Sequence, residues 1–207
     1  MVILAKKLVV VLSIEDCPYV PAKQQMTARL CRVCQPGSNQ EAHVHTYIHG
    51  FQSQLLNITL TFYRCSSYVG RKGGRQEVSI TRRCDNKGHA MHEIGHALGL
   101  WHEHSRPDRD NYIRIIWENI KENRQLNFGL ISQEEFRSIP DVGYDLESIM
   151  HYGPYAFSVN RNTNRTIEVL VNLPSCAKEL GQRRELSFKD KLRMSKLYQC
   201  TGQFAEG

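Results

Sequence analysis

Residues 92–102 read HEIGHALGLWH, which has the spacing H-E-x-x-H-x-x-G-x-x-H. On a helix, His92 and His96 are about one turn apart, so both imidazoles project from the same face. Two neutral nitrogens are thereby placed where a tetrahedral zinc ion requires them. Glu93 lies beside this pair on the same helix, which is the position of a general base next to the metal.

His102 can join the other two histidines only if the helix ends before it. At about 100° per residue, a continuing helix would turn His102 well away from their face. Gly99 is in the right place for the end of the helix, because glycine readily adopts the left-handed conformation that redirects the chain. The stretch therefore predicts a helix, a bend and a three-histidine zinc site. An amphipathic core helix with incidental histidines is the alternative.

Size and charge describe an ordinary globular protein. The chain has 207 residues, 41% hydrophobic and 23% charged, which is enough for one domain or for two small lobes. The net charge is +6, but the basic residues are scattered in short groups such as 6–7, 82–83 and 183–184. A solvated basic surface is therefore favoured over a nucleic-acid partner. Weak attraction to acidic matrix stays open.

Cysteine content indicates an oxidising compartment, because spaced structural cysteines are rare in the cytosol. The seven cysteines are at positions 17, 31, 34, 65, 84, 176 and 200. Since seven is odd, at least one of them is free or pairs outside the chain. Sequons at 57–59 and 164–166 are compatible with secretion. Residues 1–16 are interpreted either as a degraded signal peptide or as a strand, and we expect no membrane span.

The regular elements follow from periodicity and from punctuating residues. Residues 56–63 alternate apolar and polar as a half-buried strand does, and a second strand is expected from Val78 toward Cys84. A disulfide between Cys65 and Cys84 would staple these strands and contribute roughly 3 kcal/mol. Asn86 is the expected N-cap of the motif helix, which extends through Leu98.

Beyond the motif, the pattern predicts short elements joined by loops. Residues 112–117 suggest a short strand or turn, and residues 132–135 form a capping box with Phe136 as the apolar anchor. Residues 158–185 read as loops, and an amphipathic helix from Ser187 is expected to end at Cys200. The histidines at 43, 45 and 49 are interpreted as surface residues, because no carboxylate or cysteine completes a metal shell around them.

Two segments carry a family resemblance. The motif with the following residues 103–110, and the residues SIMHY at 148–152, resemble the astacin family of zinc endopeptidases. Within that family, residues 67–74 and 181–183 look closest to the tolloid (procollagen C-proteinase) branch. The resemblance covers about residues 62–200. It implies an α+β, two-lobed peptidase with a mainly antiparallel twisted sheet, an active-site helix and an irregular C-terminal lobe.

The resemblance also implies roles for individual residues. His92, His96 and His102 would bind one Zn²⁺ per chain, and Glu93 would take the proton of the attacking water. Tyr152 would ligate the metal at rest and then swing to the developing oxyanion, over an apolar floor formed by Met150. The charged loop after the third histidine would hold that ligand in place through Glu103, Asp108, Arg109 and Asp110.

Further expectations concern covalent links and the substrate. Cys65–Cys84 matches a family disulfide, and Cys200 is expected to pair with Cys34, with Cys31 and Cys17 as alternatives. Lys178 is the candidate basic side chain that selects an acidic residue after the scissile bond. In mature relatives the freed N-terminus reaches a glutamate matching Glu103. Residues 1–55 lack the opening segments of the family.

These observations together predict a secreted zinc metalloendopeptidase that acts on extracellular or matrix protein precursors as a monomeric catalytic domain. The predicted organisation is an atypical segment at 1–55, a catalytic domain at 56–200 and a tail at 201–207. The upper lobe of the catalytic domain would extend to about residue 99, and the lower lobe would span 100–200. The alternative is a catalytically impaired protein that binds zinc without cleaving peptides, because its upper lobe is incomplete.

Overall fold

The computed structural model describes residues 43–47, 55–60, 64–72, 76–81, 84, 86–171 and 180–198, the first two ranges by their backbone alone. The chain divides into two compact units. One comprises Met1–Gly99 with Tyr198–Gly207, and the other comprises Leu100–Leu197. The described part combines short strands, α-helices and 3₁₀ turns, so the fold class is α+β as predicted.

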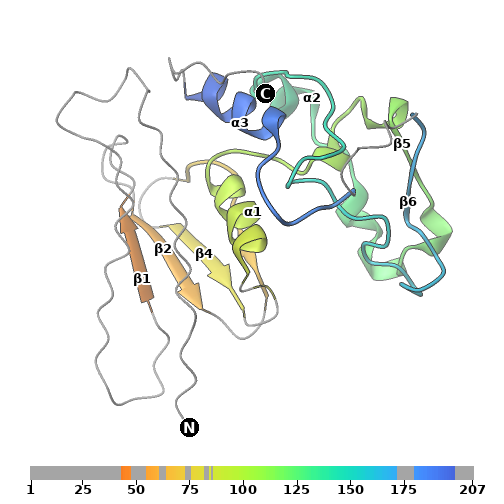
Figure 1. The fold of residues 1–207 in the computed structure, drawn as a ribbon, viewed down its shortest axis with the longest axis horizontal. Coiled ribbons are helices and arrows are strands. Elements are labelled where there is room, and N and C mark those ends of the chain that lie inside the picture. The colour runs from red at the N-terminus through yellow and green to blue at the C-terminus, as the bar shows by residue number, and fades with distance from the viewer. Residues whose placement is uncertain are drawn as a thin grey trace, which may run out of the picture. The chain divides into compact units, whose positions relative to one another are not determined.

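The first unit contains a four-stranded sheet in the order β1-β2-β4-β3 (Figure 1). The pairs β1–β2 and β3–β4 are antiparallel, whereas β2–β4 is parallel. The strands are β1 (His43–Tyr47), β2 (Leu55–Leu60), β3 (Ser66–Ser67) and β4 (Gln76–Ile80). β4 alternates buried and more exposed residues, and it ends at Ile80 rather than continuing to Cys84 as expected.

Helix α1 (Lys87–Ala97) packs against β3 and β4. Its alanines at 90 and 97 join Val78 and Ile80 of β4 in one buried cluster, with Cys65 at its edge. The predicted disulfide Cys65–Cys84 is present, with a Cα–Cα distance of 6.5 Å. It ties the chain before β3 to the segment between β4 and α1, so the sheet and the start of the helix are covalently linked.

The second unit is built around a two-stranded antiparallel sheet and several 3₁₀ turns. The strands are β5 (Ile113–Ile115) and β6 (Ile167–Val169), and the turns are Glu103–Ser105, Arg109–Asn111, Trp117–Asn119 and Glu122–Phe128. The isoleucines of this sheet pack with Ile120, Phe128 and Tyr144. β5 lies within the predicted residues 112–117, whereas β6 lies in a segment expected to be loop.

The described part of this unit also contains two α-helices. α2 (Gln133–Arg137) begins with the predicted capping box, in which Ser132 and Glu135 bond each other's backbone N–H. α3 (Phe188–Leu197) starts where the pattern placed it and buries Asp190, Arg193, Met194 and Ser195. α3 ends at Leu197, and the expected end at Cys200 lies outside the described residues.

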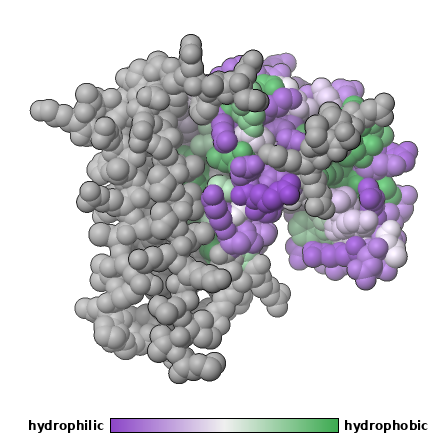
Figure 2. All heavy atoms as spheres, in the orientation of Figure 1, coloured by the Kyte–Doolittle hydropathy of each residue, from purple (hydrophilic) through white to green (hydrophobic). Residues whose placement is uncertain are grey.

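The surface of the described residues combines polar side chains with exposed hydrophobic ones such as Leu126 and Leu130. Figure 2 shows hydrophilic residues over much of its visible face, with hydrophobic residues between them. Among the described residues, no helix has both the length and the apolar character that crossing a membrane requires.

Candidate active site

The three motif histidines converge. Ligating nitrogens of His92, His96 and His102 all lie within 4.8 Å of one another. Nitrogens about 2.1 Å from one tetrahedral zinc ion lie about 3.4 Å apart, so small side-chain rotations suffice to close the set around a metal. Three neutral imidazoles that leave a fourth position open are the donor set of a catalytic zinc site. The residues therefore fit zinc.

The helix brings two ligands together, and a glycine brings the third. Asn86 caps α1 by accepting a hydrogen bond from the His89 N–H at 3.0 Å. At the other end α1 stops at Ala97, and Gly99 has a φ of 97°, the left-handed conformation predicted for the bend. The carbonyl of His96 accepts hydrogen bonds from Gly99 N–H and from Gly70 N–H, both at 2.8 Å. The loop after β3 is therefore hydrogen-bonded to the C-terminal end of α1.

Glu93 is buried on α1 between the two helical ligands in sequence. Its neighbours His92 and His96 are also buried, and their rings meet edge to face with centroids 4.7 Å apart. A carboxylate at this depth beside a metal site can accept and return a proton with little competition from bulk water.

Tyr152 stands in an aromatic enclosure next to the third ligand. Its ring centroid is 4.7 Å from that of His102 and 3.8 Å from that of His104, which it stacks at 25°. Phe128 and Phe157 pack against its other sides. Burial lowers the pKa of His104 well below its usual value, so Tyr152 stacks on a neutral imidazole. Sequence reasoning did not identify His104 as part of the site.

A buried histidine fixes the backbone of Tyr152. His151 Nδ1 lies 2.7 Å from the Tyr152 carbonyl, and its Nε2 lies 2.8 Å from the hydroxyl of Tyr144. A carbonyl can only accept, so Nδ1 carries the proton and Nε2 accepts from Tyr144. Burial lowers the pKa of His151 to about 4, which keeps this neutral tautomer at physiological pH.

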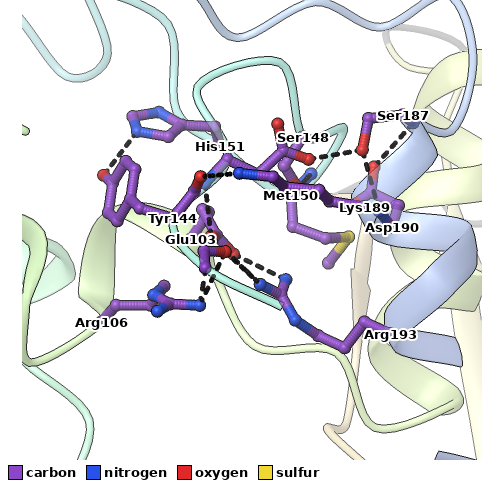
Figure 3. A network of polar contacts seen from close by, with 12 residues as sticks. Glu103, Arg106, Tyr144, Ser148, Met150, His151, Ser187, Lys189, Asp190 and Arg193 are labelled. Atoms are coloured by element: carbon purple, nitrogen blue, oxygen red, sulfur yellow. Dashed lines mark hydrogen bonds and ion pairs between the residues drawn. The ribbon is translucent and has the colours of Figure 1, made fainter. Parts of the chain in front are cut away.

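Met150 is fully buried in a turn that α3 holds (Figure 3). Asp190 accepts hydrogen bonds from the Ser148 hydroxyl at 2.6 Å and from the Ile149 N–H at 2.8 Å. The Ser148 hydroxyl in turn accepts from the Met150 N–H. Asp190 therefore sets the shape of the methionine turn, a role that sequence reasoning did not assign to it.

The charged loop after the third ligand forms an ion-pair network, as its position suggested. Glu103 is held by Arg193 of α3 through two hydrogen bonds of 2.8 and 3.2 Å, and Arg106 lies 3.6 Å away. Burial raises the pKa of Glu103, and the two guanidinium groups oppose that rise. Asp108 binds Arg106 at 2.8 Å. Glu103 and Asp108, which the sequence predicted for this role, are therefore members of the network. Arg193 is also a member, and the sequence did not predict it.

Arg109 and Asp110 are placed differently. Arg109 is buried, and its Nη1 donates to the carbonyls of His104 and Phe128, so it braces the chain on both sides of Tyr152. Asp110 pairs with Arg109 at 3.2 Å from a largely exposed position. Arg109 and Asp110 therefore pair with each other, and Arg109 holds the backbone of the loop through the His104 carbonyl.

A pocket of about 470 Å³ is lined in part by the residues that follow Tyr152 in the sequence. Three arginines and no carboxylate lie among its walls, which are residues 153–156, Arg161 and residues 180–184. Gly181 has a φ of 76°, and a Cβ there would lie 2.3 Å from Gly153 Cα. Only glycine therefore fits at position 181, where the loop of residues 181–183 lies against Gly153. The other predictions for this region and for the second disulfide, Lys178, Cys34 and Cys200, lie outside the described residues.

Comparisons with known proteins agree with this geometry. The sequence model of the Astacin peptidase family matches residues 39–199, so the match reaches further toward the N-terminus than the resemblance at 62–200. Bone morphogenetic protein 1 of Xenopus laevis is 43% identical over 137 residues, which are 66% of this chain and 19% of that protein. Tolloid-like protein 1 of Homo sapiens is 43% identical over 142 residues, 66% of this chain and 13% of that protein.

Among solved structures, high choriolytic enzyme 1, a hatching-enzyme zinc-protease of Oryzias latipes, has a TM-score of 0.62 and 39% identity. The match covers 70% of this chain and 68% of that one. The chain spans about a fifth or less of the two curated relatives. Because the family match covers most of the chain and the three histidines converge, the chain belongs to the astacin family of zinc peptidases.

Proposed function

We propose that the chain is a secreted zinc endopeptidase that cleaves extracellular or matrix protein precursors. The observation that carries this proposal is the convergence of His92, His96 and His102 beside the buried carboxylate of Glu93. Three neutral ligands with an adjacent carboxylate are the arrangement that peptide hydrolysis by an activated water requires. Membership of a peptidase family supports a protein or peptide as the substrate.

The proposed mechanism assigns each step to a side chain. Zinc, when bound, lowers the pKa of a water molecule and polarises the scissile carbonyl. Glu93 takes the proton from the attacking water and delivers it to the leaving amine. Tyr152 would be a further ligand of the resting metal, and its hydroxyl would donate a hydrogen bond to the substrate carbonyl oxygen as negative charge develops there. Met150 provides the apolar floor beneath the histidines.

The same proposal includes the organisation of the domain and its location. We assign residues 56–200 to a two-lobed catalytic domain, and the division of the chain into compact units after Gly99 supports this. The Cys65–Cys84 disulfide supports an oxidising, extracellular location, because such bonds are reduced in the cytosol.

The pocket after Tyr152 supports a preference for acidic side chains. Arg183 directs its Nη1 to the carbonyls of His151, Gly181 and Gln182, whereas Arg161 and Arg184 are exposed. We assign this pocket to the substrate residue that follows the scissile bond, and Lys178, the sequence-based candidate for the same preference, lies outside the described residues. A carboxylate in this pocket would meet guanidinium groups that bind it through paired hydrogen bonds.

A peptide-library digest of the purified chain tests this function. We expect cleavage that a chelator abolishes and zinc restores, with acidic residues enriched after the cut. Glu93→Gln should lose at least a hundredfold in kcat while still binding zinc, because it keeps the fold but cannot accept the proton. Near-normal activity of Glu93→Gln would refute the mechanism. A wild-type chain that binds zinc but cleaves nothing would support the catalytically impaired alternative.

A further inference from the structure

Glu103 is the most enclosed charged group next to the metal ligands. Its side chain is 1% exposed and follows His102 directly in the chain. A buried carboxylate is strongly destabilising unless it is paired and hydrogen-bonded. The identity of its partner therefore matters for the site as a whole.

Arg193 is its closest charged partner, and Arg106 lies further away, at 3.6 Å (Figure 3). Arg193 comes from α3, ninety residues further along the chain, and its side chain is 5% exposed. Nη1 donates to Glu103 Oε2 at 2.8 Å and Nη2 donates to Oε1 at 3.2 Å, so both carboxylate oxygens are bound. This paired geometry is specific to arginine, since lysine presents a single point charge.

Glu103 passes this constraint to the third ligand. Its N–H donates to the Met150 carbonyl at 3.2 Å, and its Oε1 accepts from the Asp145 N–H at 2.9 Å. Glu103 also opens the 3₁₀ turn Glu103–Ser105, of which His102 is the N-cap residue. Because α1 ends at Ala97, His102 depends on this turn for its place rather than on the helix that carries the other ligands.

We propose that Arg193 is a positioning residue for the metal site. Its guanidinium fixes Glu103, Glu103 fixes the turn after His102, and the affinity of the three histidines for zinc depends on that chain of contacts. His102, Glu103, Arg106 and Arg193 are all among the residues that line one small cavity, so the members of this series of contacts are neighbours. The inference rests on the three-histidine zinc site of the proposed function.

Zinc affinity of the full chain, measured by competition with a chromophoric chelator, tests the inference. Loss of a group that orients a metal ligand commonly weakens metal binding by about 10- to 100-fold, and we expect this for Arg193→Gln. The zinc affinity of Arg193→Lys should lie between those of the wild type and Arg193→Gln, because lysine keeps the charge but not the paired hydrogen bonds. Lys196→Gln, an exposed position on the same helix, is the matched control and should bind as the wild type does.

Two further readouts separate positioning from general destabilisation. The visible spectrum of the Co²⁺-substituted protein reports ligand geometry, and it should change in Arg193→Gln but not in Lys196→Gln. Millimolar guanidinium should restore part of the zinc affinity of Arg193→Ala by refilling the site. If Arg193→Gln does not fold, the double variant Glu103→Gln with Arg193→Gln removes both charges, and it should fold and bind zinc at least tenfold more weakly.

The outcomes are distinct. Wild-type zinc affinity and an unchanged cobalt spectrum in a folded Arg193→Gln chain, or wild-type affinity in the double variant, would overturn the role of Arg193 while leaving the proposed function intact. A wild-type chain that does not bind zinc through its three histidines would instead overturn the proposed function.

Discussion

Gly181 is the residue at which backbone geometry most directly limits the site. It combines a positive φ with an approach that would place a Cβ 2.3 Å from Gly153 Cα and N. We expect Gly181→Ala to lower the free energy of unfolding by roughly 3 kcal/mol or more, since it adds a clash to backbone strain. Urea unfolding measures this loss.

Gly143→Ala is the matched control for that substitution. Gly143 has the same φ of 76°, but a Cβ there would meet only the Lys189 Nζ, at 3.6 Å. It should therefore cost only the strain of a left-handed alanine, about 1–2 kcal/mol. Equal losses at the two glycines would contradict the argument from close backbone approach.

His151 makes the stability of the fold depend on pH at the residue scale. Its pKa falls from 6.5 in the unfolded chain to about 4 in the folded protein. Between these pH values the unfolded chain therefore binds more protons than the folded protein does. The contribution of neutral His151 to the free energy of unfolding is present in full above pH 6.5 and is lost as the pH falls through about 4. The full effect is roughly 3 kcal/mol.

Metal-free protein isolates this effect from the pH-dependent release of zinc. Urea midpoints for wild type and His151→Asn should be compared at pH 7.5 and pH 5, and the variant should show the smaller decline. Asparagine keeps a donor for the Tyr152 carbonyl but does not titrate. A parallel decline in both proteins would show that His151 does not carry the dependence.

At the scale of elements, α1 relies on its N-cap more than most helices do. Its first turn contains no acidic residue, so Asn86 alone among the described residues offsets the exposed N–H groups there through a side chain. We expect Asn86→Ala to cost about 1 kcal/mol, whereas Asn86→Asp should retain or slightly raise stability. Thermal or urea unfolding distinguishes them. An Asn86→Ala variant as stable as the wild type would contradict the capping assignment.

Elements with local signals were predictable from the sequence, and those without were not. The start of α1 follows from Asn86, its end from Gly99, and the start of α2 from the Ser132–Glu135 capping box. β6 was missed because a strand of three residues, followed directly by Leu170 and Val171, is too short to establish an alternating pattern. The Glu122–Phe128 turn was missed because only Phe128 of it is buried. Pairing with β5 defines β6, and burial of Phe128 anchors the turn.

The site divides in the same way. The histidines and Glu93 were predicted from local spacing, and the methionine turn was predicted from the family resemblance. Arg193 and Asp190 act on residues more than forty positions away, and His104 matters because it stacks on Tyr152. No spacing rule links such residues, because the packing of α3 and of the aromatic rings creates their roles.

At the scale of the whole molecule, zinc should stabilise the fold because only the folded chain brings the three histidines together. Free zinc at a hundred times its Kd should add about 2.7 kcal/mol. For a chain of this size that corresponds to a rise in Tm of roughly 5–10 °C. His102→Ala should lose most of this rise while keeping a similar Tm without metal. An equal rise in both proteins would place the metal elsewhere.

The pairing of Glu103 with Arg193 also has a consequence for biosynthesis. A ribosome delivers the carboxylate ninety residues before it delivers the guanidinium that neutralises it. During that interval the segment after His102 lacks the contact that closes its turn, so the third ligand is organised only after α3 has emerged and docked. Such a long-range contact forms slowly and late. Full zinc affinity therefore arises at the end of folding, once nearly the whole domain has been synthesised.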